Sequence, residues 1–551
     1  MRALALVATF VAIAACSGKG PQSVGAQPSW RHGGGSGPAA AAVQQQVTFA
    51  PQGKAVARYN EAVTAPAPTE LGDAVLAAVR EAAVTARTPQ PIADQRLFRA
   101  CNELAAIVPE EGIISYGLVE FALHRNGIIE PSPHLLVVWG DVGSPQAIVE
   151  SLSPKLVEIL AEGAHARVGI GAVKRKPDGT GAVVFALQGS WVKTRPIPRV
   201  LPARGAFTVE ATLDPRYHDP ELFVTRDSGA TERLPIAQKG SSFTAQVACG
   251  ASTGKQQVEI TASDVQGSTV LANFPVWCGT EPPETMTVEV ARDDVPPSDP
   301  VEAERRLLAM LNRDRQLAHL PALVWDERVA DVARRHSADM RATKIVAHIS
   351  PTTGSAADRV RAGKIKTAVV LENVARAYGL AEAHEGLMNS PGHRANILSH
   401  AATHVGVGVV LGEEISGRRE VFVTQVFTRV PPKIEPARAT EALLQKLVAI
   451  QQVGNSARLV GIAQQLAEQV AAGKTRDQAY PAVKPQVDAL SNTYQRVGSV
   501  ITATSDLDAL DGKSLLGDAK VDDVGIGIAQ GAHPELGENA IWVVVLLAQK
   551  R

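Results

Sequence analysis

The sequence predicts a multidomain α+β protein that contains three α/β units and one antiparallel β-sandwich. A Val-Gly-x-Gly segment occurs three times, within residues 167–171, 404–408 and 523–527, and each copy is followed by a polar turn and a second strand-like run. Helical periodicity precedes the copies. Residues 207–290 differ, because short runs there alternate apolar and polar side chains between turn residues, which is typical of an antiparallel sandwich.

Residues 1–16 are typical of a bacterial lipoprotein signal peptide. Arg2 carries a positive charge, and the apolar run that follows is too short to span a membrane. Small residues stand directly before Cys16, so we expect this cysteine to be diacylated and to become the new N-terminus. An ordinary secretory signal with an incidental cysteine is the alternative. Ser17 and Gly18 follow Cys16 in place of an acidic residue, so retention at the inner membrane is not signalled. The sequence therefore predicts a lipid-anchored protein of the bacterial cell envelope, at the outer membrane or cell surface.

Residues 17–75 are rich in Gly, Ser, Pro and Ala, and we expect them to form a disordered tether. No later apolar run approaches the roughly 20 residues that cross a bilayer, so the lipid would be the only anchor. The formal net charge of −1 gives no support to nucleic acid as a partner.

The first and last α/β units are predicted at residues 76–195 and 437–551. Helices are expected at 95–107, 114–124 and 145–160 in the first unit, and at 440–452 and 458–472 in the last. Paired glycines in each Val-Gly-x-Gly segment allow a helix or a second backbone to approach closely. A strand follows each segment, whereas a helix follows the glycines of a nucleotide-binding fingerprint. We infer common ancestry for the three units, with convergence as the alternative.

The predicted sandwich covers residues 200–290 and is of the immunoglobulin-like type. It contains Cys249 and Cys278, which we expect to form a disulfide in an oxidising compartment. Cys101 lies on the apolar face of a predicted helix and is expected to be a buried small hydrophobe. The polar residues of the sandwich form no cluster that indicates catalysis.

A Pro-rich linker at residues 291–300 leads to the middle unit, residues 301–431, which contains the most distinctive sequence motifs. Its blocks, in order, are Leu307-Leu-Ala-Met-Leu-Asn-Arg313, Leu323-Val-Trp-Asp326, Ala347-His-Ile-Ser-Pro351, Leu371-Glu-Asn-Val374, Met388-Asn-Ser-Pro-Gly-His-Arg-Ala-Asn-Ile-Leu398 and Val423-Thr-Gln-Val-Phe427. Together they resemble the CAP or SCP superfamily (cysteine-rich secretory protein, antigen 5 and pathogenesis-related 1) in its cysteine-free bacterial form. The resemblance implies a central CAP-like α-β-α sandwich, flanked here by two divergent CAP-like α/β units.

The same resemblance implies a cleft with two histidines and two acidic residues, which in some members holds a divalent cation. His348 and Glu372 match the first histidine and one carboxylate. His393 is the natural second imidazole, because Ser390 and Pro391 predict a helix start that places its ring in the first turn. Imidazole and carboxylate groups suit zinc, so His348, Glu372 and His393 are candidate metal ligands.

The fourth group of the cleft is open. Glu382 and Glu385 are the available carboxylates, but both are expected on the solvated side of their helix, and His384 is expected to bond to a backbone carbonyl. Three positions depart from the family pattern. Leu371 replaces a glycine, Leu387 replaces a tryptophan, and Phe422 stands where animal and plant members place their second histidine. Glu382 is kept as a cleft candidate.

Two functions follow from this site. In the first, the chain is a non-catalytic module that binds an envelope lipid, glycan or protein. In the second, His348, Glu372 and His393 hold zinc, and the chain is a hydrolase or protease. The sequence has no His-Glu-x-x-His pair and no Gly-x-Ser-x-Gly elbow. We therefore expect a binding module rather than an enzyme. An alternative for the three polar residues is a purely structural role.

Overall fold

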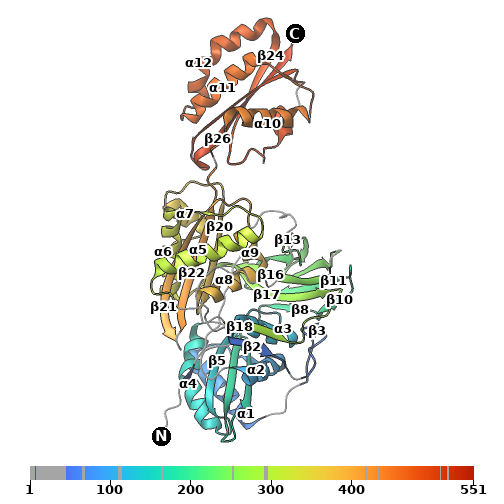
Figure 1. Cartoon of the computed structure of the whole chain (residues 1–551), viewed down its shortest axis with the longest axis vertical. Helices are drawn as coiled ribbons and strands as arrows, with labels where there is room; N and C mark the ends of the chain where they lie inside the picture. Colours follow the sequence, from blue (N-terminus) through green and yellow to red (C-terminus); the bar gives the residue numbers. More distant parts are fainter. Residues whose placement is uncertain are drawn as a thin grey trace.

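The computed structural model describes residues 6–7, 45–51, 53–64, 69–108, 115–162, 165–250, 253–290, 296–415, 418–431, 433–508, 510–517 and 520–551. Figure 1 shows a mixed α/β chain in which a C-terminal unit stands beyond the middle unit, while the β-sandwich lies to one side of the first and middle units. None of the helices within these residues is both long enough and apolar enough to cross a bilayer.

Three α/β units share one order of elements along the chain. The first contains α1 (Glu70–Ala86), β4 (Ile92–Ala93), α2 (Gln95–Ile107), α3 (Tyr116–Arg125), β5 (His134–Asp141), α4 (Pro145–Glu162), β6 (Arg167–Lys174) and β7 (Thr180–Gln188). The middle unit contains α5 (Pro300–Leu317), β19 (Val324–Trp325), α6 (Glu327–Thr343), α7 (Ala356–Ala362), β20 (Val370–Ala377), α8 (Leu380–Asn389), α9 (Pro391–Ile397), β21 (His404–Ile415) and β22 (Arg418–Thr428). The last contains α10 (Pro436–Val448), β23 (Gly454–Asn455), α11 (Ala457–Ala471), α12 (Arg476–Asp488), the 3₁₀ turn η1 (Ala489–Asn492), β24 (Tyr494–Thr504), α13 (Gly512–Leu516), β25 (Asp523–His533) and β26 (Gly537–Lys550).

The three sheets also share one strand order. It is β4-β6-β7-β5 in the first unit, β19-β21-β22-β20 in the middle unit and β23-β25-β26-β24 in the last. In each sheet the short outer strand runs parallel to its neighbour, and the other pairings are antiparallel. The first sheet has one further strand, because β1 (Leu6–Val7) pairs with β5.

The second glycine of each Val-Gly-x-Gly segment explains the packing that the units share. A Cβ added at Gly171, Gly408 or Gly527 would lie 2.1 to 2.2 Å from the backbone of α2, α6 or α11, respectively. No side chain fits in that space, so each helix lies directly against its strand. The paired glycines of the sequence therefore mark the same helix-on-strand contact three times.

The β-sandwich consists of two sheets with a common apolar core. One sheet has the order β14-β15-β11-β8 and the other β10-β17-β16-β12-β13. The strands are β8 (Val192–Thr194), β10 (Val200–Leu201), β11 (Ala206–Leu213), β12 (His218–Thr225), β13 (Thr231–Leu234), β14 (Ile236–Lys239), β15 (Ser242–Ala248), β16 (Gly254–Asp264) and β17 (Gly267–Cys278).

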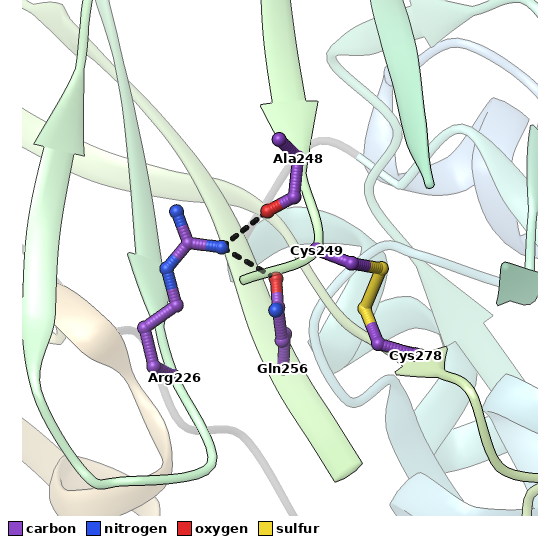
Figure 2. The surroundings of a disulfide bond; sticks show 5 residues. All are labelled: Arg226, Ala248, Cys249, Gln256 and Cys278. Atoms are coloured by element: carbon purple, nitrogen blue, oxygen red, sulfur yellow. Dashed lines mark hydrogen bonds between the residues drawn. A yellow bond between two sulfur atoms is a disulfide. The ribbon is translucent and has the colours of Figure 1, made fainter. Parts of the chain in front are cut away.

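A disulfide between Cys249 and Cys278 links the two sheets, with a Cα–Cα distance of 5.7 Å. Cys249 follows β15, and Cys278 ends β17. Figure 2 shows the Arg226 guanidinium beside this link, where it donates to the Gln256 side chain at 2.8 Å and to the Ala248 carbonyl. These contacts hold the end of β15 against the second sheet.

The two sheets of the sandwich differ in burial. Along β11, exposed and buried residues alternate strictly, as expected for a sheet with one solvated face. Along β16, residues 256–262 are all buried, although apolar and polar types alternate there. The polar face of β16 is therefore covered, because α9 of the middle unit packs against this sheet, as Figure 1 also shows.

Part of the predicted tether, residues 17–75, forms regular structure. β2 (Gln45–Phe49) pairs with β18 (Met286–Val290), β3 (Arg58–Tyr59) pairs with β9 (Ile197–Pro198), and α1 begins at Glu70. The aromatic rings explain this, because Phe49 and Tyr59 are buried in two different apolar clusters. Cys16 and most of the predicted signal peptide lie outside the described residues.

Helix α10 spans Pro436–Val448 and so begins four residues before the predicted start at residue 440. Pro436 occupies the first turn, where its fixed φ angle favours a helix and its missing N–H breaks no hydrogen bond.

Candidate functional site

His348 and Glu372 form the centre of the candidate site. The Nδ1 of His348 lies 2.8 Å from Oε1 of Glu372, and the Arg359 guanidinium donates to the other carboxylate oxygen at 2.6 Å. Arg359 also donates to the His348 carbonyl at 3.0 Å. All three residues are buried. Strand β20 supplies the carboxylate, α7 supplies the guanidinium, and the histidine lies on the segment between α6 and α7.

This cluster keeps its carboxylate ionised. Burial alone would raise the pKa of Glu372, but the His348 hydrogen bond and the Arg359 charge hold that pKa below its ordinary value. The ionised carboxylate accepts Nδ1–H from His348, which fixes the orientation of the ring. His348 Nε2 is buried and has no hydrogen-bond partner among the residues that the structure describes. Glu372 thus orients the imidazole.

His336 lies beside this cluster and is part of the scaffold. Its Nε2 is 2.9 Å from the Ala347 carbonyl oxygen, so it donates to the residue that precedes His348. Burial lowers the pKa of His336, and the ring is therefore neutral at physiological pH. Because α6 holds the backbone at Ala347 through this bond, it also positions the neighbouring His348.

Side-chain amides connect β20 to α9. Asn373 donates to the His393 carbonyl at 3.2 Å and to the Gln425 side chain at 3.1 Å. Asn396 donates to the Glu372 carbonyl at 3.1 Å and to the Asn373 side chain at 2.9 Å. All of these residues are buried, so the network fixes the helix that carries His393 against the strand that carries Glu372.

The His393 side chain belongs to a second chain of hydrogen bonds. Ser390 Oγ lies 2.6 Å from His393 Nδ1 and donates at 2.5 Å to Glu259, a residue of β16 in the sandwich. The other carboxylate oxygen of Glu259 accepts from the Gly392 backbone N–H at 2.8 Å. Ser390 was expected to cap α9, but its hydroxyl makes no cap bond. The Ser390 hydroxyl instead donates to the Glu259 carboxylate of the sandwich.

Two residues of α8 differ from the expectation. Glu382 was expected in solvent, but it is only 6% exposed and accepts from the Tyr378 backbone N–H at 3.1 Å. It therefore stabilises the start of α8. His384 was expected to bond to a backbone carbonyl, and its Nε2 instead lies 2.6 Å from Asp314 Oδ2 on α5. Helical periodicity could not reveal either partner, because both depend on how neighbouring segments pack.

Several polar atoms of the candidate metal ligands are held in contacts within the protein. Both oxygens of Glu372 are engaged, one by His348 and one by Arg359. His393 Nδ1 lies beside the Ser390 hydroxyl, and the His393 carbonyl accepts from Asn373. Within the described part of the chain, no group of three or more His, Cys, Asp or Glu side chains is placed to hold a metal ion.

Two residues that contact the site, Arg359 and Glu259, were not predicted from the sequence. Arg359 lies on a single short helix, and nothing in its local pattern indicates that it faces Glu372. Glu259 lies on a strand whose alternation places it on a face that would be solvated in an isolated sandwich. An exposed fraction of 0% for this glutamate reveals the interface.

Comparison with known proteins matches the middle unit to a protein family. Residues 308–427 match the model of the CAP family, described as the cysteine-rich secretory protein family. An uncharacterized membrane protein, YlbC of Bacillus subtilis (strain 168), is 39% identical over 109 residues, which are 19% of this chain and 31% of the relative. The uncharacterized protein YkwD of the same organism is 36% identical over 115 residues, which are 21% of this chain and 45% of the relative. The chain thus spans less than half of either relative.

Solved structures give weaker matches. An extracellular protein with an SCP domain from Bacillus anthracis str. Ames is 25% identical, with a TM-score of 0.22 over 36% of this chain and 67% of that chain. An outer surface protein from Borrelia burgdorferi is 16% identical, with a TM-score of 0.21 over 23% of this chain and 94% of that chain.

Proposed function

Because residues 308–427 form a domain of the CAP family, we propose that this chain is a lipid-anchored protein of the bacterial cell envelope whose CAP domain is a non-catalytic binding module. Its ligand would be a lipid, a glycan or another protein of the envelope. The lipid on Cys16 would hold the chain at the outer membrane or the cell surface.

One observation carries the non-catalytic assignment: the carboxylate and the hydroxyl of the cleft are engaged with neighbouring side chains. Glu372 uses both oxygens on His348 and Arg359, and the Ser390 hydroxyl is taken up by Glu259. A general base or a metal ligand needs a free lone pair directed at the reacting atom. Each oxygen of the Glu372 carboxylate is directed at His348 or at Arg359, so the geometry favours binding over a zinc-dependent hydrolase or protease. His348 Nε2 is the nitrogen on which the hydrolase alternative would depend.

Three features support the proposed location. Small residues precede Cys16, as in a lipoprotein signal. The disulfide between Cys249 and Cys278 is of the kind that persists in an oxidising compartment. The Bacillus subtilis relative YlbC is named a membrane protein.

We also propose that the outer units, at residues 76–195 and 437–551, are divergent CAP-like units, and that residues 200–290 are an immunoglobulin-like module. The shared strand order and the glycines Gly171, Gly408 and Gly527 support the first proposal. Two sheets around one core, linked by a disulfide, support the second.

Zinc titration of the full chain by calorimetry tests the non-catalytic assignment. We expect no stoichiometric uptake, and the same result for His348→Ala. Stoichiometric uptake that His348→Ala abolishes would overturn the assignment and support the hydrolase. Asn492→Ala, in η1 of the last unit, is the control for handling and concentration.

Fractionation of cells that express the full chain tests the anchor. We expect the wild type in the membrane fraction and Cys16→Ser in the soluble exported fraction. A Cys16→Ser variant that stays with the membrane would contradict lipid anchoring.

A further inference from the structure

The hairpin of β16 and β17, which we call the β16–β17 arm (residues 254–278), lies across the face of the middle unit that carries the candidate site. Near its turn, the Gln266 carbonyl accepts from the Ile349 backbone N–H at 2.9 Å, beside His348. Further along, Asn273 donates to the Asn389 carbonyl at 3.1 Å. With the two bonds of Glu259, the arm is attached on both sides of the site.

The fit at the turn of the arm is close. Gly267 has a φ of +107°, and a Cβ added there would lie 3.0 Å from the Cβ of His348. The arm thus reaches within contact distance of the histidine that Glu372 orients. The turn therefore covers part of the His348 side chain.

The third attachment is a buried carboxylate. Glu259 is fully buried, and its partners are the Ser390 hydroxyl and the Gly392 N–H, both from the start of α9. No Lys or Arg side chain is among these two partners, so both are neutral. Burying an ionised carboxylate against neutral donors costs free energy unless the carboxylate takes up a proton.

Other titratable groups face the contact between Glu259 and the start of α9, which we call the junction, from each element packed around it. The sheet contributes Lys255, Glu221 and Arg233 on the same face as Glu259. Helix α3 contributes Tyr116, Glu120 and His124, α8 contributes Glu382 and Glu385, and α9 contributes His393 and Arg394.

Several of these groups form local pairs. Glu221 pairs with Arg233 at 3.0 Å, and His124 Nε2 lies 2.9 Å from the Asn273 carbonyl oxygen. Glu120 accepts from the Ser132 hydroxyl at 2.7 Å. A small cavity lined by Glu120, Ser132, Asn273 and Ser390, among others, lies at the same junction. Glu259 is therefore buried here on neutral donors, and Glu120 lies 3.4 Å from His124 Nε2 besides its bond to Ser132.

We propose that the β16–β17 arm is a releasable cover of the CAP cleft, which is closed over His348 and Ser390 at acidic pH and loosens toward neutral pH. The inference rests on the proposed function in one respect, since it takes the covered face as the face that binds. It adds a regulatory step, because the ligand gains access when the sandwich, which contains the arm, moves away from the middle unit.

The direction follows from the carboxylates. Burial raises the pKa of Glu259 from 4.5 to about 7, and it raises that of Glu120 to about 7 as well. A group with a higher pKa in the closed form stabilises that form fully below its ordinary pKa, and the contribution is lost as the pH rises through the shifted value. Closure is therefore strongest below pH 4.5 and weakens up to about pH 7.

Hydrogen exchange of the full chain measures the opening of the arm directly. It is read by mass spectrometry and corrected for the intrinsic pH dependence of exchange. The informative amides are those of Ile349 and Gly392, which the arm protects. We expect their opening constant to increase up to about tenfold per pH unit for each coupled carboxylate between pH 4.5 and 7, and to level off above.

Matched amide variants assign the effect. Glu259→Gln removes the titration but keeps the shape of the side chain, so we expect a smaller slope at both amides. Adding Glu120→Gln should flatten the profile. Glu210→Gln, on an exposed part of β11 in the other sheet, is the control and should keep the wild-type slope.

A wild-type profile without pH dependence would overturn the cover, and this result needs no variant. The same conclusion follows if Glu259→Gln keeps the wild-type slope. Either outcome leaves the zinc and fractionation results unchanged, so failure of the cover is distinguishable from failure of the proposed function.

Discussion

The middle unit and its two outer counterparts have the same scaffold but different interiors. In the middle unit, Glu372 pairs with Val426, which pairs with Gly406. The same register places Leu135 at this position in the first unit and Ser499 in the last. On the helix that packs against the glycines, His336 of the middle unit corresponds to Leu104 and Leu466.

The same difference extends to neighbouring positions. Ser337 and Thr424 of the middle unit, which bond to each other at 2.8 Å, correspond to Ala105 and Val184 in the first unit. In the last unit they correspond to Ala467 and Val544. Apolar residues therefore fill these positions in both outer units, except at Ser499 of the last unit. The polar interior of the middle unit is not needed to build the sheet, and we attribute it to the presentation of His348.

The largest expected effect comes from breaking the ionic part of this interior. Glu372→Leu gives the middle unit the residue of the first unit but leaves the Arg359 guanidinium buried without its carboxylate. We expect the free energy of unfolding to fall by about 3 to 5 kcal/mol, measured by urea denaturation. A loss below about 1 kcal/mol would show that the pair contributes nothing that water does not replace.

The shared glycines give the next largest effect, and it should be the same in all three units. Gly171→Ala, Gly408→Ala and Gly527→Ala each push a methyl group into a helix backbone, so we expect a loss of about 1 to 3 kcal/mol or more in the unit concerned. Gly461→Ala is the control, because a Cβ there meets nothing within 4 Å in the interior of α11. That change should stabilise the last unit by up to about 1 kcal/mol. Tolerance at one of the three glycines would break the equivalence of the units.

The smallest effect concerns Ser337 and Thr424. Thr424→Val removes one hydrogen-bond partner of the Ser337 hydroxyl, which still bonds to the Gly408 carbonyl at 2.9 Å. We expect a loss of about 0.5 to 1.5 kcal/mol. Combining it with Ser337→Ala removes both hydroxyls and should be close to neutral, as in the outer units. A double variant that is less stable than the single one would mean that the polar pair is required for packing.

The sequence predicts local structure well where one segment determines it. Helix α2 has the predicted limits of residues 95–107, and the strand pairs that follow the Val-Gly-x-Gly segments lie where the pattern indicates. The strands and the helix start within residues 45–75 were not predicted. Phe49 and Tyr59 lie in a sequence rich in small and polar residues. Phe49 is buried in the cluster that contains α2 and α3, and Tyr59 in the core of the sandwich, so the burial of both depends on segments distant along the chain.

The candidate site could be predicted in part for the same reason. The resemblance identified His348 and Glu372, and these two residues do form a hydrogen bond. Arg359 and Glu259 could not be found, because their roles arise from tertiary contacts with β20 and with α9. The alternation along β16 even indicates solvent on the side where the middle unit packs.

The most direct test of the account converts the middle interior to the apolar kind. The triple variant His336→Leu, Arg359→Leu and Glu372→Leu replaces the buried charges and the neighbouring ring without leaving one charge unpaired. We predict that it folds with wild-type circular dichroism and recovers most of the stability that Glu372→Leu loses, while hydrogen exchange at Ile349 increases because His348 is no longer held. A triple variant that fails to fold, or that is as unstable as Glu372→Leu, would contradict the claim that the polar interior serves the cleft and not the scaffold.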